Sequence, residues 1–321
     1  MLTRIQNFTH TLALSMMISC AVLMQFVTLG AEAQVKAARP KIAILVFSGV
    51  EVIDYAGPFE ALTYARKDGA SYFEIYIVAA KKETLKSAGG LKIIPDYDFG
   101  DAPTPDYLIV PGGNIGGPLN NDGVINWIKT ISAKTRVTMS VCNGAYLLAK
   151  AGLLDNKKAT TTASGAYSKG LANYGKNIDV LYDQRFVWSE NIITTAGLSS
   201  GIDGALSLIE REISKGAAQD AALSMEYHWQ PEVKFVRSRL AEMTFIATAS
   251  MLKSKDFKGN VVKSGGDENQ WEKVLRVTEV QGLDALMTKV LNSLKQEDGW
   301  ASIVKKGNTL ESQFVDKRGR S

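Results

Sequence analysis

The sequence predicts an α/β protein whose mostly parallel sheet is covered by helices on both faces, followed by a smaller α+β segment. Three observations predict this class: short apolar runs recur, helical patterns separate them, and this alternation stops near residue 231. A continuous apolar run is typical of a strand buried on both faces. Strands that alternate with helices are typical of a parallel sheet.

The first half of the α/β region contains four predicted strands and two predicted helices. One helix is expected to begin at Pro58, because proline is favoured in the first turn of a helix. A second helix is expected around residues 124–131, where Val124, Trp127 and Ile128 are spaced for one face. The strands are the runs at residues 41–47 (KIAILVF), 72–79 (YFEIYIVA), 107–110 (YLIV) and 137–141 (VTMSV).

The alternation continues in the second half of this region. Residues 145–151 predict a helix that ends at Gly152, and residues 192–195 predict another strand. A strongly periodic helix is expected from Ser200, and Asp203 and Glu210 fall outside its apolar stripe. That stripe consists of Ile202, Leu206, Ile209 and Ile213.

The residues after the α/β region differ in character. A polar stretch at residues 253–269 is expected to be an exposed loop. An amphipathic helix is expected at residues 283–294, and strands at residues 271–280, 302–306 and 313–316. We therefore predict an α/β domain over residues 41–231 and a small α+β extension over residues 232–321.

The first 33 residues have the pattern of a secretory signal peptide. Arg4 precedes an apolar stretch, which ends before the small-x-small sequence of residues 31–33. The sequence therefore predicts an exported protein, periplasmic or secreted. The alternative is an uncleaved membrane anchor, because the stretch approaches the length of a membrane span; contact with a membrane is expected only in that case.

Composition limits the classes of partner. The net charge of +4 is mild and not arranged as a polybasic stripe, so together with export it argues against nucleic acid binding. Cys142 is the only cysteine after the signal, which excludes an internal disulfide. We expect no metal site, because one cysteine and His228 do not form a ligand cluster. We expect no cofactor either, since residues 112–117 lack the lysine that a P-loop requires.

Cys142 is the residue that most strongly indicates chemistry. It lies between a predicted strand and a predicted helix in TMSVCNGA, residues 138–145. Ligands bind at the carboxyl ends of parallel strands, and this order resembles the nucleophile elbow of hydrolases. Because a helix N-terminus stabilises a thiolate, we expect a lowered pKa for this thiol. The alternative is a buried, unreactive cysteine.

Two further strand ends supply candidate partners for Cys142. Gly113 follows the strand at residues 107–110, and its N–H together with that of Asn143 could form an oxyanion hole. Asp54 follows the first strand and could act as acid or base in the same crevice. The alternatives are a plain turn at Gly113, and a solvated loop residue or helix cap at Asp54.

Five motifs in chain order resemble the DJ-1/PfpI (ThiJ/PfpI) superfamily of class I glutamine amidotransferase-like proteins. They are IAILVFSGVEVIDYAGPFEAL, DYLIVPGG, SVCNGAYLLAKAGLLDNKKATTT, IITTAGLSSGIDGAL and EYHWQPE, and they cover about residues 41–231. The resemblance is strongest to the branch with isonitrile hydratase and the amidase-like domains of AraC-type regulators. It implies a flavodoxin-like three-layer α/β/α sandwich, usually a homodimer. It also implies that Cys142 is the reactive cysteine, Asn143 and Gly113 the oxyanion residues, and Asp54 the acid.

The departures from the superfamily pattern narrow the expected chemistry. Thr162 occupies a position where related regulators often carry histidine, and His228 lies in the EYHWQPE tail, so a Cys/His peptidase is not expected. Isonitrile hydration needs a cysteine and an acid, although Asn143 replaces the threonine of the isonitrile hydratase pattern. We therefore expect an exported cysteine-dependent enzyme, a lyase or hydrolase, that acts on a small electrophile. The alternative is a non-catalytic ligand-binding or redox-sensing module that uses the same thiol.

Overall fold

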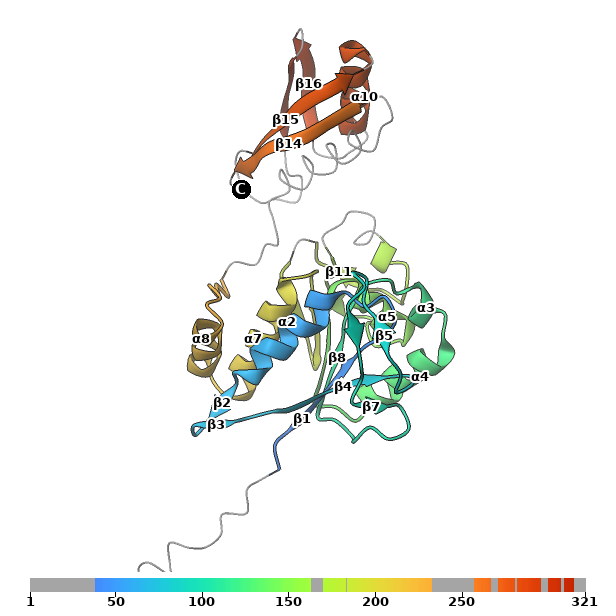
Figure 1. The fold of residues 1–321 in the computed structure, drawn as a ribbon, viewed down its shortest axis with the longest axis vertical. Coiled ribbons are helices and arrows are strands. Elements are labelled where there is room, and N and C mark those ends of the chain that lie inside the picture. Colours follow the sequence, from blue (N-terminus) through green and yellow to red (C-terminus); the bar gives the residue numbers. More distant parts are fainter. Residues whose placement is uncertain are drawn as a thin grey trace, which may run out of the picture. The chain divides into compact units, whose positions relative to one another are not determined.

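The computed structural model describes residues 38–162, 170–182, 184–232, 257–266, 271–280, 282–295, 300–306 and 309–314 (Figure 1). The predicted signal segment at residues 1–33 lies outside these residues. Within the described ranges, no helix has both the length and the apolar character that crossing a bilayer requires.

A seven-stranded sheet forms the centre of the α/β domain, with the order β12-β13-β9-β8-β1-β4-β7. Its strands pair in parallel, except that the edge strand β12 runs antiparallel to β13. The strands predicted from apolar runs are confirmed, and Tyr107–Val110 and Ile192–Thr195 have the predicted bounds. The strands are β1 (Lys41–Leu45), β4 (Glu74–Ala79), β7 (Tyr97–Asp98), β8 (Tyr107–Val110), β9 (Val137–Ser140), β12 (Phe186–Ser189) and β13 (Ile192–Thr195).

Helices cover both faces of this sheet, which confirms the predicted flavodoxin-like sandwich (Figure 1). One layer contains α2, α7 and α8, which pack against one another, and the other contains α3, α4 and α5. Every residue of β8, β9 and β13 is buried, as expected for strands between two helical layers. The helices are α2 (Val52–Thr63), α3 (Gly116–Leu119), α4 (Asp122–Ser132), α5 (Ala145–Lys150), α7 (Ser200–Glu212) and α8 (Lys215–Ser224).

The start of α2 differs from the prediction. Pro58 lies inside the helix, and the helix begins six residues earlier, at Val52. Proline in a helix interior removes one backbone hydrogen bond, so its presence favoured a later start. The extended backbone of Glu51, whose N–H donates to the Gly112 carbonyl, instead sets the beginning of the helix. Asp54 therefore lies in the first turn of α2, not in a loop before it.

The remaining elements of the α/β domain are short. An antiparallel pair follows α2, another lies between β4 and β7, and a parallel pair flanks residues 163–169. They are β2 (Arg66–Lys67), β3 (Ala70–Ser71), β5 (Leu85–Lys86), β6 (Lys92–Ile93), β10 (Lys158–Ala159) and β11 (Asp179–Val180).

The described part of the extension contains two hairpins and a helix. The predicted exposed loop at residues 253–269 is wrong in its centre, where Phe257–Gly266 forms a strand that pairs antiparallel with β15. Val261 and Val262 are exposed there among lysines and glycines, so the apolar alternation that marks a half-buried strand is missing. The elements are β14 (Phe257–Gly266), β15 (Trp271–Val280), α10 (Leu283–Lys295), β16 (Trp300–Lys306) and β17 (Thr309–Phe314).

The strand order brings distant segments to one edge of the sheet. From β1 the chain first moves outward to β4 and β7, then returns to the other side of β1 through β8, β9 and β13. A reversal of this kind opens a crevice at the carboxyl ends of the strands. The segments after β1, β8, β9 and β13 all meet there.

Candidate active site

Cys142 lies at a sharp turn between β9 and α5. Its backbone has φ of 59°, a left-handed conformation that costs a non-glycine residue on the order of 1 kcal/mol. A single turn of 3-10 helix, Cys142–Gly144, leads from the strand into α5. The Cys142 N–H donates to the Ala196 carbonyl at 3.1 Å, and the Gly144 N–H donates to that of Val141 at 2.9 Å. The predicted sharp turn between strand and helix is confirmed, and Cys142 is half-buried.

Gly144 allows this turn to pack directly on the end of β8. A Cβ atom at this position would lie 2.2 Å from the carbonyl oxygen of Val110 and 2.8 Å from that of Pro111. No side chain fits at such distances, because carbon and oxygen atoms are in contact well beyond 3 Å. The glycine that follows Asn143 is therefore a steric requirement of the elbow.

Asp54 is fully buried beside Cys142. One carboxyl oxygen accepts the Gly112 N–H at 3.1 Å, and the other accepts the Leu198 N–H at 3.0 Å. The carboxyl group also shares a hydrogen bond with the Cys142 thiol. The structure thus brings Asp54 and Cys142 together, and the carboxylate links the segments after β8, β9 and β13.

The two acidic groups have raised pKa values. Burial raises the pKa of Asp54 to about 6, although the N–H groups of Leu198 and Gly112 oppose this by stabilising the carboxylate. Burial, followed by repulsion from the Asp54 carboxylate, raises the pKa of the Cys142 thiol to about 12. The expected lowering of the thiol pKa is therefore wrong, because the amide of Asn143 does not outweigh burial and a nearby negative charge. At neutral pH the pair holds one proton.

The side chain of Asn143 forms two hydrogen bonds with the backbone of Gly113, and this changes the predicted oxyanion hole. Its side-chain oxygen accepts the Gly113 N–H at 2.8 Å, and its side-chain nitrogen donates to the Gly113 carbonyl at 2.9 Å. The predicted oxyanion hole from both backbone N–H groups is thus not formed in this structure, since that of Gly113 is already engaged. The backbone N–H of Asn143 donates to the Cys142 sulfur instead. The pair of Asn143 and Gly113 supports the elbow.

Thr162 is a site residue whose role the sequence indicated only weakly. Its hydroxyl forms a hydrogen bond with Cys142 that lowers the pKa of the thiol. Gly197 lets both groups approach, because a Cβ there would lie 3.2 Å from the Cys142 sulfur and 3.0 Å from the Thr162 hydroxyl. Thr161 contributes differently, by donating its hydroxyl to the Cys142 carbonyl at 2.9 Å. Threonines in a strand-like run are common β-formers, so their presence here was only a weak functional signal.

Other potential functional groups lie elsewhere. His228 is exposed, and its ring contacts the side chain of Gln230 at 3.2 Å. Among the residues that the structure describes, no three His, Cys, Asp or Glu side chains are grouped in a way that could hold a metal ion.

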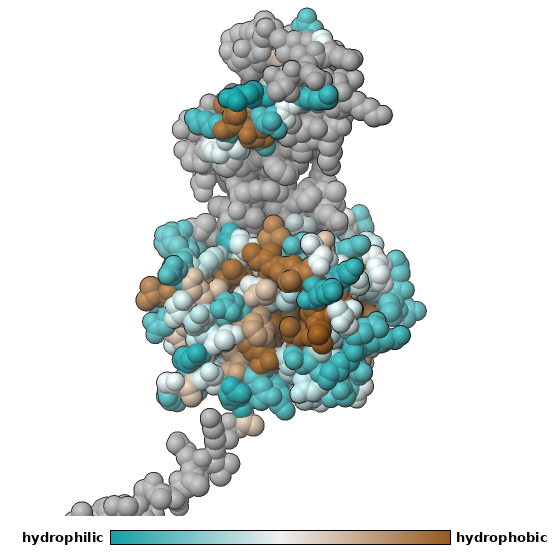
Figure 2. Space-filling view, in the orientation of Figure 1, coloured by the Kyte–Doolittle hydropathy of each residue, from teal (hydrophilic) through white to brown (hydrophobic). Residues whose placement is uncertain are grey.

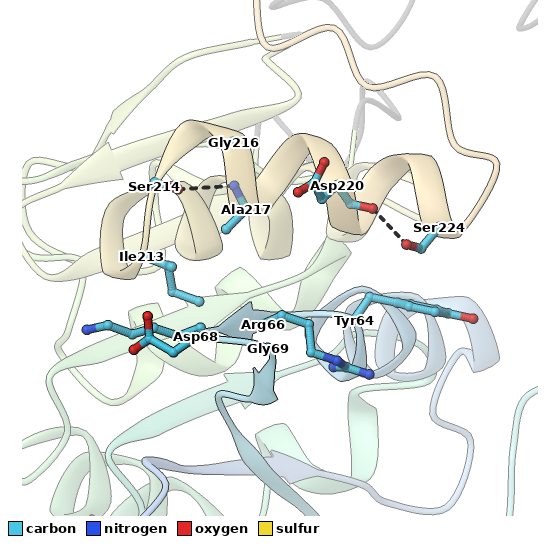
Figure 3. Close-up of a pocket in the computed structure, with 11 residues that line it drawn as sticks. Tyr64, Arg66, Asp68, Gly69, Ile213, Ser214, Gly216, Ala217, Asp220 and Ser224 are labelled. Carbon is cyan, nitrogen blue, oxygen red and sulfur yellow. Dashed lines mark hydrogen bonds between the residues drawn. The ribbon is translucent and has the colours of Figure 1, made fainter.

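A surface pocket of about 590 Å³ is formed far from the thiol (Figure 3). Its walls come from the residues after α2, from the β2–β3 turn and from the start and outer face of α8. Tyr64 in its wall caps the end of α2, whereas Asp54 lies in the first turn; the two are ten positions apart, a rise of about 15 Å along the helix. This pocket therefore belongs to the opposite edge of the sheet.

The fold and the site together define a flavodoxin-like α/β/α protein that presents a thiol at a nucleophile elbow, with a buried carboxyl group beside it. The family model described as "DJ-1/PfpI family" matches residues 40–211. This chain belongs to the DJ-1/PfpI family.

Individual relatives agree with this assignment. The chain is 32% identical over 188 residues to isonitrile hydratase of Pseudomonas putida, a match that covers 58% of this chain and 78% of the relative. A ThiJ/PfpI family protein from Pseudomonas syringae has a similar structure, with a TM-score of 0.56, 30% identity, and coverage of 66% of this chain and 85% of that protein. An AraC family transcriptional regulator from Pseudomonas putida shares the fold at a TM-score of 0.50 and 16% identity, covering 58% of this chain and 99% of the regulator.

Proposed function

We propose that this chain is a cysteine-dependent enzyme that hydrates an isonitrile or a closely related small electrophile. The observation that carries the proposal is the hydrogen-bonded pair of Cys142 and Asp54, which holds one proton at neutral pH. Addition of a thiol to an isonitrile requires a sulfur nucleophile and a proton donor at the same carbon atom. The similarity to isonitrile hydratase supports the same substrate class.

The first step joins the substrate to the enzyme. Asp54 takes the thiol proton, the sulfur of Cys142 forms a bond to the terminal isonitrile carbon, and Asp54 returns the proton to that carbon. The product is a thioimidate, in which the carbon carries one hydrogen and is doubly bonded to nitrogen. The hydroxyl of Thr162 and the N–H of Asn143 stabilise the sulfur while it is anionic.

The second step releases the product with water. Asp54, again a carboxylate, takes a proton from water as the water oxygen bonds to the thioimidate carbon, and it passes this proton to nitrogen. The carbon–sulfur bond then breaks as the remaining hydroxyl proton passes through Asp54 to the sulfur. The sum is addition of one water to the isonitrile, which gives an N-substituted formamide and the free thiol.

The state of Gly113 favours this chemistry over hydrolysis of amides. Acyl transfer places negative charge on oxygen from the first step, and two amide donors commonly stabilise it. Here the Gly113 N–H is bound to the Asn143 side chain. Addition to an isonitrile carbon places no charge on oxygen in the first step, so it does not need that donor.

The test is formamide production from alkyl and aryl isonitriles by the purified mature chain. We expect turnover that Cys142→Ser abolishes and that Asp54→Asn lowers by about 10² or more, the usual contribution of an acid–base group. Asp106→Asn is the matched control, because Asp106 accepts the Lys41 N–H at the opposite edge of the sheet. Full turnover by Cys142→Ser, or no isonitrile turnover by the unaltered chain, would contradict the proposal.

The redox-sensing alternative has less support at the same thiol. Oxidation proceeds through the thiolate, and the raised pKa of Cys142 keeps that form scarce. Peroxide treatment followed by mass measurement tests it, and reversible sulfenic acid formation at micromolar peroxide would favour this alternative.

We also propose that the mature chain is exported and forms a homodimer. Export rests on the signal pattern of residues 1–33. A dimer is supported by the hydrophobic side chains that gather on the visible face of the sandwich in Figure 2 and by exposed large residues such as Leu91, Ile94 and Leu198. An N-terminus at residue 34 in the exported protein and sedimentation at twice the monomer mass would support these two proposals. An uncleaved chain and a monomer would contradict them.

A further inference from the structure

The turn between β13 and α7 donates a backbone hydrogen bond to Asp54 from a residue with a strained backbone. Leu198, whose N–H donates to the Asp54 carboxylate at 3.0 Å, has φ of 60°. A leucine in this left-handed region is uncommon and persists only when its surroundings hold it there. The position of this N–H therefore depends on what anchors residues 196–199.

One buried ion pair anchors that turn. The guanidinium of Arg185, just before β12, donates through Nε to the Asp203 carboxylate at 2.8 Å, and its Nη2 also pairs with this carboxylate. Asp203 lies in the first turn of α7 and is only 3% exposed. The Tyr227 hydroxyl lies 3.1 and 3.2 Å from the two Asp203 oxygens and accepts from Arg185 Nη2 at 3.2 Å. The polar groups of these three side chains are thus hydrogen-bonded to one another.

Arg185 also contacts the turn at both of its ends. Its carbonyl accepts the Ala196 N–H at 2.9 Å, and Nη2 donates to the Ser199 hydroxyl at 3.4 Å. The Ala196 carbonyl in turn accepts the Cys142 N–H at 3.1 Å. A single residue thus links the segment before β12, the elbow of Cys142 and the start of α7.

We propose that Arg185, Asp203 and Tyr227 form a positioning network that holds the Leu198 N–H on the Asp54 carboxylate and so sets the pH at which the Asp54–Cys142 pair becomes reactive. The role in catalysis rests on the proposed function, but the effect on the thiol does not. The network also gives a role to the EYHWQPE motif, in which Tyr227 is the aromatic residue that reaches the ion pair. None of the three side chains contacts the thiol.

The direction of the effect follows from the hydrogen bond. An N–H that donates to a carboxylate favours its ionised form, so loss of the Leu198 contact raises the pKa of Asp54 further. Two other titratable groups act on Asp54: Glu51, which raises its pKa, and the Cys142 thiol, which lowers it. Neither contacts the network, and both are unchanged by its removal. The reactivity of Cys142, which begins as the pair loses its first proton, should therefore begin at higher pH.

The experiment measures the rate of Cys142 alkylation by iodoacetamide against pH for full mature chains. Tyr227→Phe removes the bridging hydroxyl, and Arg185→Lys keeps the charge but loses the forked contact. We expect the acid limb of the profile to move upward by about one pH unit for Arg185→Lys and by a smaller amount for Tyr227→Phe. Isonitrile turnover should show the same displacement.

Matched controls separate this effect from a general loss of structure. Tyr107→Phe removes a hydroxyl that donates to Glu212 at 2.6 Å, and Arg136→Lys alters the ion pair with Asp106; both lie at the other edge of the sheet. Their alkylation profiles should match that of the unaltered chain. An unmoved acid limb in a folded Tyr227→Phe and Arg185→Lys would overturn the proposal. If Arg185→Lys does not fold, Tyr227→Phe alone decides. If the variants displace the acid limb of the alkylation profile but the unaltered chain does not turn over isonitriles, the proposed function is refuted and the positioning network is still supported.

Discussion

At the scale of single residues, the central feature is one proton shared by two groups that are both poor acids. Burial disfavours the charged form of Asp54 and of Cys142, and repulsion from the Asp54 carboxylate raises the pKa of the thiol further. The protons therefore leave in two widely separated steps that belong to the pair. Between these steps a minor species carries the thiolate beside a neutral carboxylic acid. This species combines the nucleophile with the proton donor that an addition reaction requires.

Asp54→Asn should separate the two roles of the carboxylate. Because repulsion by Asp54 and its hydrogen bond to the thiol both raise the pKa of Cys142, the variant should have a lower thiol pKa. Turnover should nevertheless fall, since the proton donor is gone. The pH dependence of iodoacetamide alkylation measures the first effect, and formamide production measures the second.

The unaltered chain provides the comparison for this variant. Its alkylation and turnover should both rise as pH increases through about 6, where Asp54 loses its proton. Asp54→Asn should lack that step. A thiol pKa that stays unchanged or rises in Asp54→Asn would show that the carboxylate does not control the sulfur.

Site residues differed in how far the sequence could predict them. Cys142 and Asp54 were predictable because each follows an apolar strand, and strand ends meet at one edge of a parallel sheet. The hydrogen bond from the Gly113 N–H to the Asn143 side chain was not predictable, because the spacing of residues in a sequence does not reveal a side-chain rotamer. Asp203 fell outside the apolar stripe of its helix, which is typical of a solvated residue, yet it is buried by Arg185. The Leu198 contact is made by backbone and has no residue-type signature.

At the scale of elements, the reactive turn depends on how closely β8 and the start of α5 approach each other. Gly144 has helical backbone angles, so its requirement for glycine comes from space and not from conformation. The obstructing atoms are main-chain carbonyl groups of Val110 and Pro111, which cannot rotate away. An added methyl group must therefore push the elbow and the strand end apart.

Gly144→Ala should destabilise the chain by about 1–3 kcal/mol, the usual cost of overpacking, and displace the thiol. Gly117→Ala in α3 is the matched control, because a Cβ there meets nothing within 4 Å. It should leave stability unchanged or raise it slightly, since alanine is the better helix former. Thermal unfolding and alkylation rates check both variants. Equal stability of the two would mean that the elbow can move without cost.

Among the elements, strands with continuous apolar runs were the most predictable. Residues 107–110 and 192–195 are buried on every side, and their bounds matched. The beginning of α2 was not predictable from the local pattern. Proline usually marks the start or the end of a helix, whereas Pro58 lies inside this one. The strand Phe257–Gly266 was missed because it is polar and exposed where it is described. Such a strand forms because it pairs with a neighbouring strand, and its amino-acid composition does not indicate it.

At the scale of the whole molecule, one hydrophobic cluster supports the sandwich. Its buried members extend from Ile42 to Ala222, and partly buried side chains as far as Trp229 pack against it. The residues that hold the candidate site, from Asp54 to Tyr227, fall within the same span. Among the residues that the structure describes, this cluster ends at Trp229, and on this basis we predict that residues 232–321 are not needed for folding of the α/β domain or for the candidate site.

A chain of residues 34–232 should therefore fold and keep the reactive pair. We expect one cooperative thermal transition, within about 4 °C of that of the 34–321 chain, which corresponds to a change of roughly 1 kcal/mol for a domain of this size. The pH profile of Cys142 alkylation should be the same for both chains. Failure of the shorter chain to fold, or a displaced profile, would show that the extension completes the domain or the site.

The main chain and the side chain of Leu198 have separate roles. Its amide donates to the Asp54 carboxylate, while its side chain is 52% exposed and takes no part in that hydrogen bond. Exchanging leucine for methionine, asparagine or glycine, none of which is β-branched, keeps the amide in place. On the proposed function, we therefore expect substitutions at this one position to change substrate preference without displacing the amide that donates to Asp54.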